Sequence, residues 1–198
     1  LRVAAAVLRG DQTGALDHNE GVTGALVARL QAANPDDALF APLVEALSAV
    51  PAAQKREPLV AKAMSGATSQ RKESREAALR LAYESPAILQ LAGASENYNR
   101  LVKQGSDSAL VEGLAFAGSL NYAKGAFKEA MPEIRRLVAA GLSHSSSQVR
   151  AAAVSALRTI EPLKSDQELL AKLNALGNDR DATSTYTPRR GSTLSVTA

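Results

Sequence analysis

The first candidates for acid–base chemistry are the two histidines, because histidine is the side chain whose ordinary pKa lies near neutrality. His18 and His144 lie far apart in the sequence, and no G-x-S-x-G motif supplies a serine nucleophile for either of them. Ser69 and Lys72 have the S-x-x-K spacing of one class of nucleophile, but the companion motifs of that class are missing. We interpret His144 as a solvated or capping residue of a turn between helices, and we predict that the protein is not an enzyme.

The stretch over residues 10–20 gathers four candidate metal ligands, Asp11, Asp17, His18 and Glu20. Counted from Asp11, the third, fifth and sixth positions are Thr, Ala and Leu, whereas a calcium-binding EF-hand loop needs acidic or amide residues and then Gly there. The chain has no Cys, which excludes disulfides, cysteine-bound metals and thiol catalysis, and it has no Gly-rich phosphate loop. We therefore expect no metal ion and no cofactor, and we interpret residues 10–20 as a polar hinge between helices.

Basic residues are the remaining candidates for binding. They are concentrated between residues 54 and 85, where acidic residues are interleaved with them, and a further pair stands at 135–136. A surface of this kind is either a solvated face with weak local ion pairs or a docking strip for an acidic peptide, a phosphate or an anionic surface. The candidate partner-binding residues are Lys55, Arg56, Lys62, Arg71, Lys72, Arg135 and Arg136.

The composition favours helices as the elements that position these side chains. Of the 198 residues 45% are hydrophobic, mostly Ala, Leu and Val, whereas aromatic residues make up only 4% and Trp is absent. Ala and Leu are strong helix formers, while strands favour β-branched and aromatic residues, so we predict an all-α fold. The net charge of +3 is too small for the field of a nucleic-acid-binding protein, and no apolar run reaches the roughly 18 residues of a membrane span.

A helical repeat is visible in the pattern of apolar residues. Residues 127–143 and 145–160 predict two helices joined by a short polar turn, and the apolar positions of the second helix are spaced for one helix face. The serines at 145–147 are candidates for its N-cap. Residues 57–66 and 69–85 predict the same helical hairpin at an offset of 75 residues, which is about twice the length of one helical repeat.

The segments between and around these two hairpins fit the same repeat. Residues 86–120 predict a hairpin whose first helix is broken or shortened near Gly93, since glycine weakens a helix interior. Residues 22–50 predict another pair of helices, and residues 165–177 predict a last helix with a Ser or Asp cap at its start. Stacked in chain order, these units would make about four to five helix pairs.

The sequences QVRAAAVSALRTI (148–160) and ESREAALRLA (73–82) resemble the second helix of HEAT repeats, which typically reads Val-Arg-x-Ala-Ala-x-x-Ala-Leu. The resemblance implies a right-handed α-α superhelix, a HEAT-like α-solenoid over residues 1–176, that works as a non-catalytic scaffold for protein interaction. LRVAAAVLRG at the start is similar to a second helix without its first, so the N-terminal repeat would be incomplete. The family's turn Asp is replaced by His144 and Ser69, and we expect serine capping to substitute for it.

Two other interpretations stay open beside the scaffold. ALVEGLAFAGSLNYAKGAFKEAMPEI (109–134) is similar to the helical domain of vitellogenin-like lipid carriers, which implies a lipid partner. HEAT-type enzymes, namely bilin lyases and DNA glycosylases, share the architecture, although the glycosylases rely on aromatic residues that are scarce here. For the scaffold we expect another protein with an acidic segment as the partner, no nucleic acid, and no membrane span.

The two ends of the chain carry separate expectations. Residues 177–198 are polar and predict either a tail or the start of a β segment, because Leu194 and Val196 alternate with small polar residues. The chain begins with Leu1 rather than Met, so a targeting signal could precede it, and we assign no compartment.

Overall fold

The computed structural model describes residues 20–48, 50, 54, 56–120, 122 and 125–176. Within these residues all regular secondary structure is helical and no strand occurs, which confirms the predicted all-α class. The start of the chain, the polar segment after residue 176 and Lys55 lie outside the described residues, and the expectations for them stay predictions.

The longer helices fall into two layers, which we call the first and the second layer. The first layer holds α2 (Glu20–Ala32), α5 (Glu57–Met64), α7 (Ala92–Gln104), α10 (Met131–Leu142) and α12 (Gln167–Leu176). The second layer holds α3 (Phe40–Ser48), α6 (Lys72–Glu84), α8 (Asp107–Ser119) and α11 (Ser147–Thr159). Short helical turns connect them: η1 (Ser65–Thr68), η2 (Pro86–Gln90), α9 (Gly125–Glu129) and η3 (Glu161–Leu163).

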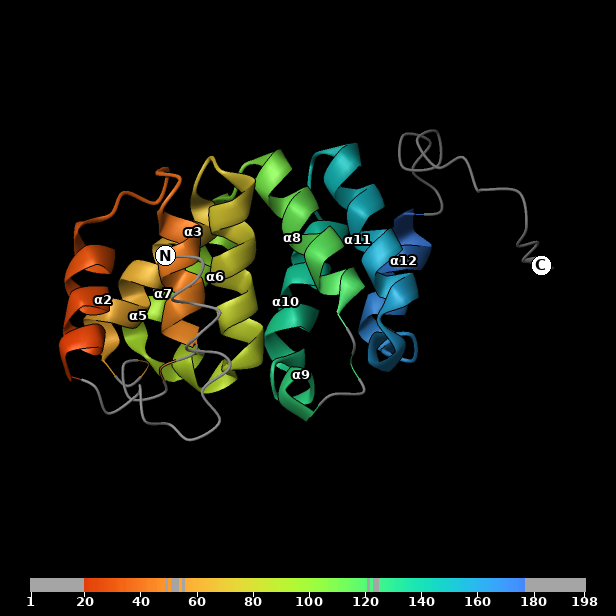
Figure 1. Ribbon diagram of the computed structural model, residues 1–198. Helices are drawn as coiled ribbons and strands as arrows, with labels where there is room; N and C mark the ends of the chain where they lie inside the picture. The colour runs from red at the N-terminus through yellow and green to blue at the C-terminus, as the bar shows by residue number, and fades with distance from the viewer. Residues whose placement is uncertain are drawn as a thin grey trace.

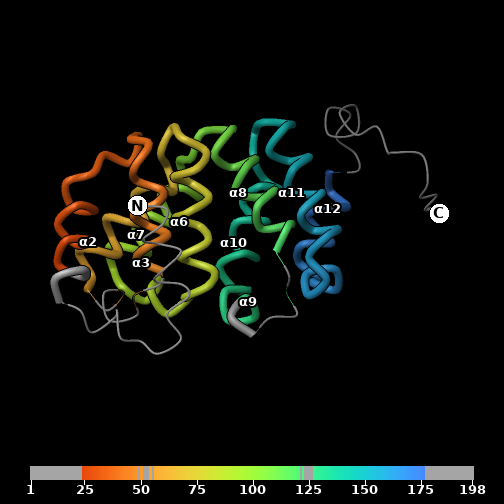
Figure 2. Tube along the Cα trace, viewed as in Figure 1, coloured from red at the N-terminus to blue at the C-terminus, as the bar shows by residue number. Residues whose placement is uncertain are grey.

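Neighbouring hairpins lie side by side in chain order. In the second layer α3 packs on α6, α6 on α8 and α8 on α11; in the first layer α2 packs on α5, α5 on α7, α7 on α10 and α10 on α12. Figure 1 shows this progression from α2 at one end of the molecule to α12 at the other, and the Cα trace of Figure 2 follows the same order. Each hairpin therefore buries its apolar faces against the hairpins before and after it.

The core is one continuous cluster of buried apolar side chains that extends from Leu26 in α2 to Leu169 in α12. Its largest fully buried members include Tyr83 and Tyr98, whose hydroxyl oxygens lie 3.2 Å apart. Tyr98 also donates a hydrogen bond of 2.8 Å to the carbonyl oxygen of Glu133 in the next hairpin. Burial, the largest cause, raises the pKa of both phenols, so both stay neutral donors that link neighbouring hairpins.

Proline positions explain several helix boundaries. The predicted single helix over residues 127–143 is divided into α9 and α10, and Pro132 stands in the first turn of α10. Proline has no backbone N–H and its ring clashes with the preceding turn, so a helix starts there rather than continuing through it. Pro58 marks the start of α5 in the same way, and Pro86 follows the end of α6.

The expectation of a broken helix near Gly93 is wrong, because α7 is a continuous helix of 13 residues. A Cβ atom placed at Gly93 would lie only 2.6 Å from the Cβ of Ala61 in α5. The amide of Asn97, one turn further along α7, donates to the carbonyl oxygens of both Ala61 and Gly93 at 2.9 Å. Glycine is therefore needed at position 93 for the close approach of α7 to α5, not to interrupt the helix.

The inter-helix turns are stabilised differently from the predicted serine capping. No side chain caps the start of α11; instead Nδ1 of His144 accepts the N–H of Ser146 at 3.1 Å, in the capping role predicted for this histidine. In the earlier hairpin the hydroxyl oxygen of Ser69 does accept the N–H of Arg71, at 3.0 Å. Asp36 of the preceding hairpin also binds this turn, where its carboxylate accepts from the hydroxyl of Ser69 at 2.6 Å and from the N–H of Gln70 at 2.8 Å.

The two repeat arginines are buried and bind these turns. Arg75 donates to the carbonyl oxygens of Ser69 and Gln70, both at 2.6 Å, and Nε of Arg75 donates to Glu112 of the next hairpin at 3.0 Å. Arg150 makes the equivalent bonds to the carbonyl oxygens five and six residues before it, at 2.6 and 3.0 Å. A positively charged side chain thus satisfies backbone acceptors that the turn leaves open.

Candidate functional site

The predicted partner-binding residues do not form one patch. Arg56 and Lys62 belong to the start and the interior of α5 in the first layer, and Arg71 and Lys72 stand at the start of α6 in the second layer. The pair at 135–136 lies on α10 in the first layer. The predicted partner-binding residues that the structure describes therefore lie in both layers.

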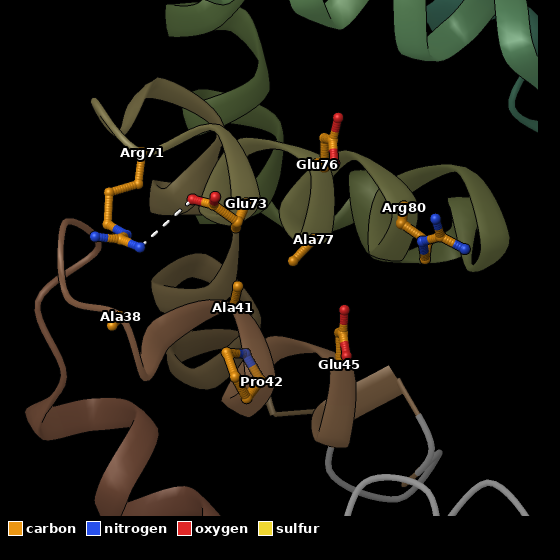
Figure 3. A pocket seen from close by; sticks show the side chains of 9 residues that line it. All are labelled: Ala38, Ala41, Pro42, Glu45, Arg71, Glu73, Glu76, Ala77 and Arg80. Atoms are coloured by element: carbon orange, nitrogen blue, oxygen red, sulfur yellow. Dashed lines mark ion pairs between the residues drawn. The ribbon is translucent and has the colours of Figure 1, made fainter. Parts of the chain in front are cut away.

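A cleft between α3 and α6 receives one part of the predicted strip. Its volume is about 260 Å³, and Arg71 and Arg80 lie at its two ends (Figure 3). Between them the small side chains of Ala41 and Ala77 face each other and leave the space open (Figure 3). The remaining lining residues are Ala38, Pro42, Glu45, Glu73 and Glu76.

The charged groups of this cleft are already partnered within the chain. Arg71 pairs with Glu73 at 3.6 Å, as the dashed line in Figure 3 marks, and Lys72 pairs with Glu76 at 3.6 Å. Arg80 forms an ion pair with Glu84 at 3.9 Å, and Glu45 also has an interaction partner. Exposed pairs of this kind contribute little to stability, but they leave no charge unmatched for a ligand.

A larger groove crosses three successive helices of the first layer, and we call it the first-layer groove. Its volume is about 680 Å³, within the range of roughly 300–1,000 Å³ that ligand sites occupy. Its floor is formed by Val102, Ala139 and Ala140, while Asn99 and Ser143 add neutral polar groups. Three cations and one carboxylate line it: Lys103 of α7, Arg136 of α10, and Lys172 and Glu168 of α12.

The guanidinium of Arg136 is held in place at the edge of this groove. It lies over the ring of buried Tyr98, 5.4 Å from the ring centroid, which is a favourable position for a cation on an aromatic face. Arg136 also forms an ion pair with Glu133 one turn earlier on α10. Because the hydroxyl of Tyr98 donates a hydrogen bond to the backbone carbonyl of Glu133, the ring, the carboxylate and the guanidinium form one fixed cluster.

The other predicted arginine of α10 joins hairpins rather than offering a free charge. Nε of Arg135 donates to Asp166 at 2.5 Å, and its Nη2 donates to Glu168 at 2.7 Å. This contact raises the pKa of Arg135, chiefly through its hydrogen bond to Asp166, and it lowers the pKa of Asp166 in return. Arg135 also compensates the charge of Glu168, the only carboxylate among the lining residues of the first-layer groove.

The lysines of the groove are the cations that remain available. Within the described part of the chain neither Lys103 nor Lys172 forms an ion pair, and Lys172 only donates to the hydroxyl of Ser143 at 3.1 Å. The sequence analysis missed both, because single lysines in otherwise ordinary helices do not stand out as a cluster. The sequence carries one signal for Lys172, because this lysine follows Arg136 by 36 residues, the length of one repeat.

A third hollow, between α8 and α11 of the second layer, is mostly apolar. It has a volume of about 290 Å³, and small residues such as Ala115, Gly118 and Ala152 line it. No group of three or more His, Cys, Asp or Glu residues that could hold a metal ion occurs among the described residues. In that same part of the chain, no helix has the length and the apolar character needed to cross a membrane.

Comparison with protein-family models, with curated proteins and with solved structures finds no match to this chain.

Proposed function

We propose that the protein is a non-catalytic scaffold for protein interaction, built as a HEAT-like solenoid whose stacked hairpins follow a right-handed superhelix. The observation that carries this proposal is the first-layer groove, which is open to solvent, has a volume of about 680 Å³ and extends over three successive helices. A surface assembled from equivalent parts of neighbouring hairpins is what a stacked repeat offers to a partner.

Two features of the molecule support binding over catalysis. The cleft between α3 and α6 holds three carboxylates, but two of them are ion-paired with cations and the third is not free. The groove, by contrast, presents two lysines that no carboxylate of the described residues neutralises.

The scaffold proposal is tested by quantitative capture with the full chain immobilised as bait. We compare the wild-type chain with a groove variant, Lys103→Glu/Lys172→Glu, and with a control variant, Arg29→Glu/Lys128→Glu, which has the same change in charge at exposed positions outside the groove. We expect at least one protein to be retained by the wild type and the control and lost from the groove variant. Retention of chaperones alone, or identical retention by all three baits, would refute the proposal.

A further inference from the structure

Equivalent positions of successive hairpins carry polar or basic side chains along the first layer. Asn99, Arg136 and Lys172 are 37 and 36 residues apart, and all three line the first-layer groove. Lys62 of α5 lies 37 residues before Asn99. Some of the hydrogen bonds between neighbouring hairpins join residues at similar separations of 35 to 37, while others span as few as 29. We call these four residues the basic row.

The helices that carry the row are neighbours in space as well as in register. In the first layer α5 packs on α7, α7 on α10 and α10 on α12, so a ligand that follows the row crosses the helices in chain order. Lys103 lies one helical turn after Asn99 and adds a charge beside the row. Among the described residues, Lys62, Lys103 and Lys172 form no ion pair, so their charges face solvent or a ligand.

We propose that the basic row binds an extended acidic segment of a protein partner, with a carboxylate on every third residue of that segment. The proposal rests on the scaffold function above and adds the chemistry and the conformation of what the scaffold holds. Carboxylates of the segment pair with the cations Lys62, Arg136 and Lys172, and at Asn99 the carboxylate accepts from the neutral amide, with the charge of Lys103 beside it. Small side chains between the carboxylates lie against Val102, Ala139 and Ala140.

The spacing of packed helices selects the conformation of the segment. Helices pack with their axes about 8–10 Å apart, so equivalent side chains on neighbouring helices recur at about that interval. A polyproline II segment has three residues per turn and a rise of about 3.1 Å, so every third side chain lies on one side at intervals of about 9 Å. A β-strand places alternate side chains on one side at about 6.6–6.8 Å, which does not match the row.

The lining of the groove favours a peptide over a nucleic acid. Proteins that hold single strands combine positive charge with aromatic side chains on which the bases stack. None of the residues that line the first-layer groove is aromatic, and Tyr98, which lies under Arg136, is fully buried. The floor offers small aliphatic contacts, which suit proline and alanine side chains between carboxylates.

The test measures binding of the full chain to two labelled peptides by fluorescence anisotropy. Both peptides have about twelve residues, or about four turns of polyproline II, and the same content of Asp and Pro. One has Asp at every third position, and the other has its Asp residues consecutively. We expect the spaced peptide to bind the wild-type chain more tightly, and the affinity to fall as salt is added.

The variants locate the site. We expect Lys103→Glu/Lys172→Glu to weaken binding of the spaced peptide about tenfold, since two exposed attractions become repulsions. The control Arg29→Glu/Lys128→Glu should leave the affinity within about twofold. Lys62→Glu should weaken binding of the full-length peptide but not of a peptide half as long, because only the longer one reaches from Lys172 to Lys62.

Three outcomes would overturn the proposal: equal affinity for the two peptides, an equal loss in the groove and control variants, or tighter binding of a single-stranded oligonucleotide with the same charge. Circular dichroism shows whether each variant keeps the helical fold. If neither peptide binds while the capture experiment still shows a partner that depends on the groove, the acidic-segment proposal fails and the scaffold proposal stands. If both experiments are negative, both proposals fail.

Discussion

Exchanging one methyl group between α5 and α7 tests the close approach of these two helices. In Gly93→Ala the new Cβ would lie 2.6 Å from the Cβ of Ala61, whereas carbon atoms in contact are normally about 3.5–4.0 Å apart. The helices would have to separate by about 1 Å, which overpacking data put at about 1–3 kcal/mol. The helix propensity of Ala returns at most about 1 kcal/mol, so we expect a net loss of about 1–2 kcal/mol.

The second half of the test removes the methyl group from the other side. Ala61→Gly alone should lower the free energy of unfolding by about 1–2 kcal/mol, through helix propensity and a lost contact. In the double variant Gly93→Ala/Ala61→Gly the collision is gone, so the loss should be about 1–2 kcal/mol smaller than the sum of the two single losses. Urea denaturation followed by helical circular dichroism measures all three variants.

Gly24→Ala in α2 is the control, because no atom lies within 4 Å of its added Cβ, and it should stabilise the protein by about 0.5–1 kcal/mol. If Gly93→Ala were as stable as the wild type, or if the two single losses simply added, the close approach of α7 to α5 would not explain the glycine. The helix would then tolerate a side chain at position 93, and the reasoning given for this position would be refuted.

Three further predictions concern the links between hairpins. Gly141→Ala places a Cβ 2.8 Å from its nearest neighbour and should destabilise by about 1–3 kcal/mol, whereas Gly113→Ala meets only ordinary contacts at 3.5 Å or more and should stabilise by up to about 1 kcal/mol in the same urea assay. The hydrogen bond from Ser69 is the largest cause that lowers the pKa of Asp36. The stabilisation that the charged carboxylate gives is therefore fully present above the ordinary pKa of 3.8 and is lost as the pH falls through the lowered pKa. Asp36→Asn should accordingly make the free energy of unfolding depend less on pH in the acid range. Arg75→Met leaves buried acceptors without a donor and should lower the free energy of unfolding by about 3 kcal/mol, measured by urea denaturation.

Local sequence patterns predicted most of the helices and one long-range regularity. The offset of 75 residues between the two predicted hairpins is repeated in their buried arginines, because Arg75 and Arg150 both bind the carbonyl oxygens five and six residues before them. Periodicity shows which side of a helix is apolar, and capping residues and prolines show where it begins and ends. Both signals lie within one hairpin, and both can be read from the sequence.

Contacts between hairpins could not be predicted in the same way. The use of Asp36 to complete the turn at Ser69 depends on which turns meet across some 33 residues of chain. Gly93 was misread for the same reason, because a glycine that permits close packing and a glycine that ends a helix look alike until the neighbouring helix is known.

The interval at which the hairpins repeat also sets where residues lie on the candidate binding surface. Asn99, Arg136 and Lys172 recur at intervals of 37 and 36 residues on α7, α10 and α12, which pack on one another in that order. Any outward position repeated at the same interval must then form a row across the helices, whatever its side chain. The buried residues that pack neighbouring hairpins together set the spacing of the basic row, and the exposed residues set its charge. Exchange of the groove lysines should therefore change binding while the hairpins stay packed, whereas a substitution that separates α5 from α7 should disturb stability and the row together.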